Sequence, residues 1–132
     1  MLSLTKGGIT MATVKSFTSL EQSRKLAKIL PLETADMYWW FSGKRYYIEA
    51  MDDGDFNEEE GHVRAWSLAA LLGVLPKRIE LEGVAYELSI YLNGLYYWNV
   101  NNGNLLLEVK GKDNLVDACV AMIEKLNELN LL

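Results

Sequence analysis

The sequence predicts an α+β fold, in which an antiparallel β-meander and an additional β-hairpin are packed by N-terminal, central and C-terminal helices. Two Asn-Gly pairs, at residues 93–94 and 102–103, divide a region rich in aromatic and branched residues into segments of hairpin type. Amphipathic segments with capping residues stand on both sides of the strand regions and predict helices. Because strands and helices do not alternate regularly, the pattern favours α+β over a parallel α/β sheet.

Length and composition indicate one globular domain over residues 16–132, since the chain has 132 residues, of which 50% are hydrophobic and 23% charged. The single cysteine excludes a disulfide framework and favours a cytoplasmic location. No apolar run approaches the roughly 20 residues that span a bilayer, so no membrane contact is expected. The net charge of −5 argues against binding to nucleic-acid phosphates, which requires concentrated Lys and Arg.

Residues 1–15 are expected to be a flexible N-terminal segment, because they lack periodicity and contain two adjacent glycines. Two interpretations of residues 1–10 stay open. They are either a native tail or a translated leader ahead of a native start at Met11, since Lys-Gly-Gly can be encoded by a ribosome-binding sequence.

The first helix and the first hairpin are expected in the N-terminal half. Residues 18–30 begin with Thr-Ser-Leu-Glu-Gln, which offers a capping box, and Pro31 ends the helix. Aromatic runs on both sides of Ser-Gly-Lys predict a hairpin over residues 37–50. A stacking platform for bases would interleave basic residues among exposed aromatics. Here Lys44 and Arg45 sit at the turn, so we expect a hairpin buried on both faces with a charged tip.

Residues 65–76 predict a short buried helix, apolar almost all round, and residues 78–110 predict three or four strands. If each Asn-Gly pair forms a two-residue loop, Tyr91 pairs with Tyr96 and Trp98 pairs with Leu107. Side chains alternate across a strand, so this register places all four residues on one face, which we expect to carry the helices.

The last helix is expected to begin after Asp113 as its cap and to place an apolar stripe against the sheet. Cys119 lies on this stripe, so we expect a buried thiol that reacts slowly.

The loop DDGDFNEEEGH, between the hairpin and the central helix, matches part of the pattern of a calcium-binding EF-hand loop. Asp53, Asp55 and Asn57 occupy positions one, three and five of an EF-hand loop. Glu58 replaces the glycine of position six, and Arg64 replaces the bidentate glutamate of position twelve. We therefore expect a solvated acidic loop and no metal.

Catalytic constellations are sparse in this sequence. It holds one histidine, His62, and one cysteine, too few for a zinc site built from soft ligands. The Gly-Lys pair at residues 111–112 lacks the other residues of a phosphate-binding loop. We expect neither a cofactor nor an enzyme.

Three segments, LPLETADMYWW, WSLAALLGVLP and NLVDACVAMIEKLNEL, resemble small proteins encoded in prophages and other mobile elements of gut Bacteroidetes. The resemblance covers the chain from about Ser16 to its end. It implies a phage or mobile-element accessory protein. Because these segments are packing motifs, it assigns no activity and no site residue.

The leading hypothesis is a non-enzymatic protein of inhibitor, immunity or regulatory type that binds another protein. The acidic loop suits a basic partner, because charge speeds encounter and an aromatic side chain can fill a pocket. The residues expected to carry this contact are Asp53, Asp55, Phe56, Glu58 and Glu59. A tolerated insertion is the alternative interpretation of the loop.

Two other classes of function stay open, as does a homo-oligomer. One is a small ligand-binding domain or enzyme that uses carboxylates and tyrosines. The other is a nucleic-acid-associated protein, which would require the scattered basic residues to converge on one surface; these are Arg24, Lys25, Lys28, Lys44 and Arg45.

Overall fold

The structure is a computed structural model that describes residues 5–6, 9–10, 15–92 and 94–132. It confirms the α+β class. The helices are α1 (Leu20–Leu26), α2 (Leu68–Val74) and α3 (Leu115–Glu128), with short 3-10 turns η1 (Leu32–Thr34) and η2 (Glu58–Glu60). The strands are β1 (Thr5–Lys6), β2 (Ile9–Thr10), β3 (Met37–Phe41), β4 (Tyr46–Ala50), β5 (Val63–Ala65), β6 (Arg78–Leu81), β7 (Val84–Tyr91), β8 (Gly94–Trp98) and β9 (Leu105–Val109).

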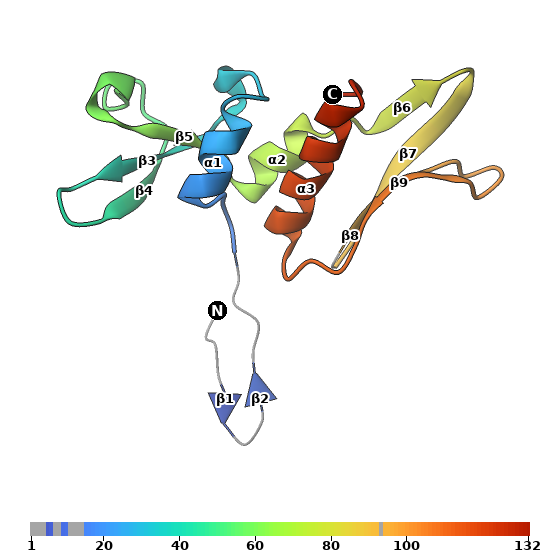
Figure 1. The fold of residues 1–132 in the computed structure, drawn as a ribbon, viewed down its shortest axis with the longest axis horizontal. Helices are drawn as coiled ribbons and strands as arrows, with labels where there is room; N and C mark the ends of the chain where they lie inside the picture. The colour runs from blue at the N-terminus through green and yellow to red at the C-terminus, as the bar shows by residue number, and fades with distance from the viewer. Residues whose placement is uncertain (1–4, 7–8, 11–14, 93) are drawn as a thin grey trace.

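The three helices occupy the middle of the molecule, between two sheets (Figure 1). A three-stranded sheet of order β4-β3-β5 lies on one side, and a four-stranded meander of order β6-β7-β8-β9 lies on the other. Helix α1 packs against β5, while α3 packs against α2 and against β8 and β9. The expectation for residues 1–15 falls mostly outside the described residues. Among those described, no helix has the length and apolar character needed to cross a membrane.

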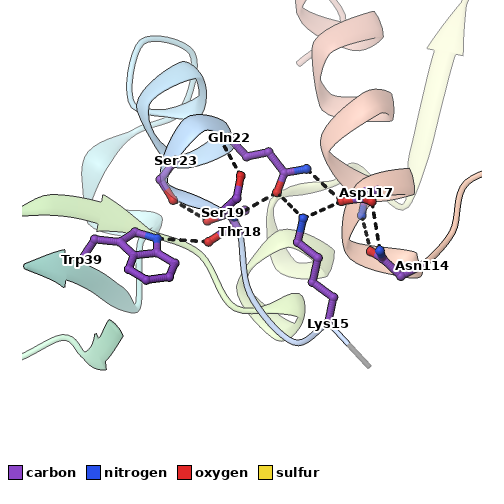
Figure 2. A network of polar contacts seen from close by, with 8 residues as sticks. All are labelled: Lys15, Thr18, Ser19, Gln22, Ser23, Trp39, Asn114 and Asp117. Atoms are coloured by element: carbon purple, nitrogen blue, oxygen red, sulfur yellow. Dashed lines mark hydrogen bonds and ion pairs between the residues drawn. The ribbon is translucent and has the colours of Figure 1, made fainter. Parts of the chain in front are cut away.

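The capping box of α1 forms as predicted, between Ser19 and Gln22. The Ser19 hydroxyl accepts from the Gln22 backbone N–H at 3.1 Å, and the Ser19 N–H donates to Gln22 Oε1 at 3.0 Å (Figure 2). In α3 the cap is Asn114, one residue later than expected, because its side-chain oxygen reaches the N–H of Asp117 at 2.8 Å. The predicted Asp113 cap is therefore wrong.

The hairpin β3–β4 forms as predicted and gains a third strand, β5, that the sequence did not reveal. Within the hairpin, Tyr38 is buried, at 2% exposed, whereas Met37 and Trp39 on the other face are only partly buried. At the tip, Phe41 and Tyr46 are 51% and 37% exposed. The expectation of full burial is wrong there: the two rings pack on each other at 4.9 Å between centroids, and the Arg24 side chain of α1 reaches the Tyr46 hydroxyl, yet both rings stay partly open to solvent.

The register of β7 and β8 differs from the prediction by two residues. Tyr91 pairs with Gly94, not with Tyr96. The reason is that Gly94 belongs to the strand: a side chain there would collide with the carbonyl oxygen of Val109 on the neighbouring strand β9. A shift of two residues keeps every side chain on its face.

A β-bulge in the last hairpin changes the faces as well. Trp98 pairs with Leu105, whereas the preceding residue, Tyr97, pairs with Leu107. The extra residue between these pairs rotates the rest of β9 by one position, so Leu107 joins the face of Tyr97 instead of that of Trp98. The prediction that Trp98 pairs with Leu107 is wrong.

Helix α3 therefore covers the opposite face from the one expected. The sheet residues beneath it are at most 4% exposed, and they are Leu95, Tyr97 and Val109. Trp98 lies on the other face and is only partly buried. Cys119 of α3 is 0% exposed, as predicted, and burial raises the pKa of its thiol to about 12.

Candidate binding surfaces

The acidic loop, residues 52–62, is held by short-range hydrogen bonds. Asp52 Oδ1 accepts from the Gly54 N–H at 2.9 Å, and the Asn57 side chain accepts from the Glu59 N–H at 2.9 Å. His62 Nδ1 accepts from the Asn57 N–H at 3.0 Å, which closes the loop and requires that this ring nitrogen carry no proton.

A stack of aromatic and cationic side chains supports the loop from beneath. Phe56 meets Tyr38 edge-on at 5.5 Å between ring centroids, and His62 stacks on Tyr38 at 5.2 Å. The Arg64 guanidinium lies 4.5 Å from the centre of the Phe56 ring, on the side provided by β5. Phe56 is thus partly buried by its own chain, where it fixes the loop on the sheet.

The tyrosine at the base of this stack, Tyr38, has a raised pKa. Burial raises the pKa of Tyr38, and its hydrogen bond to Glu49 at 3.1 Å adds to the increase. The phenol therefore stays neutral and donates to the carboxylate, which is a structural arrangement rather than that of a proton acceptor.

The six carboxylates of the loop divide into two groups of three. Those with a partner are Asp52, which accepts from the Gly54 N–H, Glu58, which pairs with Arg64 at 3.3 Å, and Glu60, which lies 3.8 Å from His62 Nε2. Asp53, Asp55 and Glu59 make no side-chain hydrogen bond or ion pair with the part of the chain that the structure describes. These three are exposed. Within the described ranges, no cluster of three or more potential ligands could hold a metal ion.

A second surface is the open face of the four-stranded sheet, on the side away from α3. In the described part of the chain, no helix lies over it (Figure 1). It carries a hollow of about 440 Å³ lined by Tyr91, Tyr96, Trp98, Gly103 and Leu105. The register predicted from the sequence places these aromatic residues on the helix-covered side, which is wrong, because α3 covers Leu95 and Tyr97.

The side chains of the open face are held in fixed positions. Tyr91 and Tyr96 meet edge-on at 5.1 Å, and the Trp98 indole N–H donates to the Ser89 hydroxyl at 2.7 Å. Tyr91 and Leu105 remain 54% and 49% exposed. These rings are therefore ordered by contacts within the sheet while one side of the cluster stays open to solvent.

A third surface is a groove of about 600 Å³ between α1 and β5, where Arg24 and Lys28 contribute positive charge and Glu58 offsets the charge of Arg64. It does not join the remaining basic residues. Arg24 reaches the Tyr46 hydroxyl at 3.4 Å, and Arg45 reaches the Tyr47 hydroxyl at 2.8 Å.

Tyr46 and Tyr47 are adjacent in β4, so their side chains point to opposite faces of the three-stranded sheet. Arg24 and Arg45, which donate to these two hydroxyls, therefore lie on opposite sides of that sheet. The basic set required for nucleic-acid binding does not converge on one surface.

Potential catalytic residues lie in separate parts of the fold. Cys119 is enclosed in α3, whereas His62 packs on Tyr38 at the small sheet. A thiol with a raised pKa and no adjacent base has little nucleophilic thiolate. The geometry of these two residues does not form a Cys–His pair.

Comparison with known proteins gives no family for this chain: no protein-family model, curated protein or solved structure matches it.

Proposed function

We propose that this protein is a non-enzymatic binding domain of inhibitor, immunity or regulatory type that acts through contacts with other proteins. The observation that supports it most is the open face of the four-stranded sheet. Tyr91, Tyr96 and Trp98 form an ordered aromatic cluster with no helix over it among the described residues. Tyr and Trp are the side chains that contribute most to protein–protein affinity, because they bury large areas at low entropic cost.

The acidic loop supports a second contact, with a basic protein partner. Asp53, Asp55 and Glu59 are exposed and make no side-chain hydrogen bond or ion pair with the described residues. Their negative charge would speed the approach of a basic surface. The role of Phe56 in this proposal is to hold the loop on Tyr38 and Arg64, rather than to fill a pocket of the partner.

The test is capture of partners from the native host with tagged protein, comparing wild type with two variants. Tyr96→Ser alters the open face, and Asp53→Asn/Asp55→Asn/Glu59→Gln neutralises the loop without touching the Glu58–Arg64 pair. We expect the loop variant to melt at or above the wild-type temperature, because it removes repulsion between like charges.

A partner that is lost with one variant and retained with the other assigns the contact to that surface. Loss of a partner at the loop should be largest at low salt, because exposed charges are screened as ionic strength rises. Capture of the same partners by wild type and both variants would refute the proposal.

A further inference from the structure

The charge of the open face is nearly balanced, in contrast to the rest of the molecule. Its rim carries Arg78 beside Glu80 at 3.0 Å and Lys110 beside Glu108 at 3.9 Å, and Glu87 stands opposite Arg78 in the register of β6 and β7. The rim therefore holds three carboxylates and two cations, a net charge of −1. A strongly charged partner finds no complementary excess on this face.

The acidic excess lies elsewhere. Six carboxylates lie within residues 52–60 of a chain whose net charge is −5. This loop belongs to the three-stranded sheet, and the helices separate it from the four-stranded sheet (Figure 1). Two molecules that approach through their open faces therefore keep their most acidic segments away from the contact. Repulsion between their net charges is correspondingly weak.

The size of the face sets the strength of such a contact. The four strands have 4, 8, 5 and 5 residues, so at about 3.3 Å per residue and about 4.8 Å between strands the face covers about 350 Å². This is below the roughly 800 Å² that each partner contributes to a standard stable interface, and it matches a weak association.

We infer that the open face binds the same face of a second copy of the chain. The inference rests on the proposed function, because it names the partner of the surface proposed there. The centre of the contact is the cluster of Tyr91, Tyr96 and Trp98, and the paired charges of the rim surround it. Two sheets stacked face to face exclude water from these rings at a separation of about 10 Å. The dimer presents one acidic loop at each end.

The test is the oligomeric state over a dilution series of the whole chain, from about 1 to 200 µM, by sedimentation velocity. Tyr91→Asp places a charge in the cluster at a side chain that is 54% exposed. Phe41→Asp is the matched control, because Phe41 is an aromatic residue of similar exposure, 51%, at the tip of the other sheet.

We expect wild type and Phe41→Asp to change from monomer to dimer across the series, and Tyr91→Asp to raise the dissociation constant by about tenfold or more. If Tyr91→Asp melts well below wild type, Leu105→Asp provides the second variant, since Leu105 is 49% exposed on the same face.

A monomeric wild type at every concentration overturns the inference, as does an equal effect of the control. Failure of the proposed function looks different. A monomer whose captured host protein is lost with Tyr91→Asp keeps the binding role of the face and rejects only the second copy as its partner. If the protein is monomeric and wild type and Tyr91→Asp capture the same proteins, the open face binds neither a second copy nor a host protein.

Discussion

Asp117→Asn tests the polar network that joins α1 to α3 (Figure 2). Asp117 Oδ1 accepts from Lys15 Nζ at 2.7 Å and from Gln22 Nε2 at 2.9 Å, and Oδ2 accepts from Asn114 Nδ2 at 2.9 Å. The asparagine amide would keep one acceptor and turn a donor towards another donor. It would also remove a favourable charge from the first turn of α3.

The expected loss of unfolding free energy is moderate. The Lys15 and Asp117 side chains are 28% and 29% exposed, so solvent screens their ion pair and its contribution is about 1 kcal/mol. The unsatisfied or mismatched hydrogen bonds add a similar amount, which gives about 1–2 kcal/mol in total. For a domain of this size, the melting temperature should fall by about 4–8 °C.

The pH dependence gives a sharper criterion. Burial alone would raise the pKa of Asp117, but the hydrogen bonds from Lys15 and Gln22, with the Lys15 charge and Asn114, lower it below its ordinary value. A carboxylate whose pKa is lowered by folding stabilises the fold above its unfolded-state pKa, near 3.9, and this contribution disappears as the pH falls through the lower folded-state value.

The assay is urea unfolding followed by tryptophan fluorescence, at about pH 7 and again below about pH 4. The difference between wild type and Asp117→Asn should shrink at the acidic end. Asp113→Asn is the control, because Asp113 is exposed and its side chain makes no hydrogen bond or ion pair with the residues that the structure describes. Equal losses for the two variants, or a loss that does not change with pH, would refute the reasoning.

Three further predictions concern the core and the four-stranded sheet. Cys119 should react slowly with thiol reagents in native buffer, and Cys119→Ser should cost about 1–3 kcal/mol in urea unfolding, because a hydroxyl replaces a thiol in an apolar site. Trp66→Ala should lower the free energy of unfolding by about 3–5 kcal/mol, because Trp66 is 0% exposed. Trp98→Ala should lower it clearly less, because Trp98 is only partly buried. A larger loss for Trp98→Ala than for Trp66→Ala would contradict the assignment of faces. Gly94→Ala should lower the melting temperature, because its side chain meets the carbonyl of Val109, and an unchanged melting curve would place β9 further away.

Features that depend on neighbours in sequence could be predicted. The capping box of Ser19 and Gln22 requires only a spacing of three residues. The burial of Cys119 follows from its place on the apolar stripe of a helix that must cover a sheet. The capping box lies within α1, and the burial of Cys119 depends only on which face of α3 it occupies. Both features therefore follow from residues close together in the sequence.

The register of the meander could not be predicted from the Asn-Gly signals alone. The first signal, at residues 93–94, favours a turn for a local reason, yet Gly94 is required in a strand by the close approach of Val109, a residue 15 positions away. The bulge after Tyr97 likewise depends on how β9 packs under α3. Long-range packing therefore decided between two locally acceptable registers.

The candidate site was only partly predictable for the same reason. The acidic character of residues 52–60 is visible in the sequence. The position of Phe56 is not, because it depends on β5, whose Arg64 comes to lie over the ring only when this strand pairs with β3.

The four-stranded sheet has an open face because each of the three described helices packs elsewhere. Helix α1 packs on β5, α2 packs on α3, and α3 covers the sheet face that holds Leu95, Tyr97 and Val109. Because the bulge places Leu107 and Val109 of β9 on that same face, α3 packs on apolar side chains there, and none of the three described helices is left for the other side. The aromatic cluster centred on Trp98 is exposed as a direct consequence. If the ladder continued from the Trp98–Leu105 pair without a bulge, Leu107 and Val109 would lie on the face of Trp98. The bulge therefore contributes both to the core beneath α3 and to the surface proposed to bind a partner.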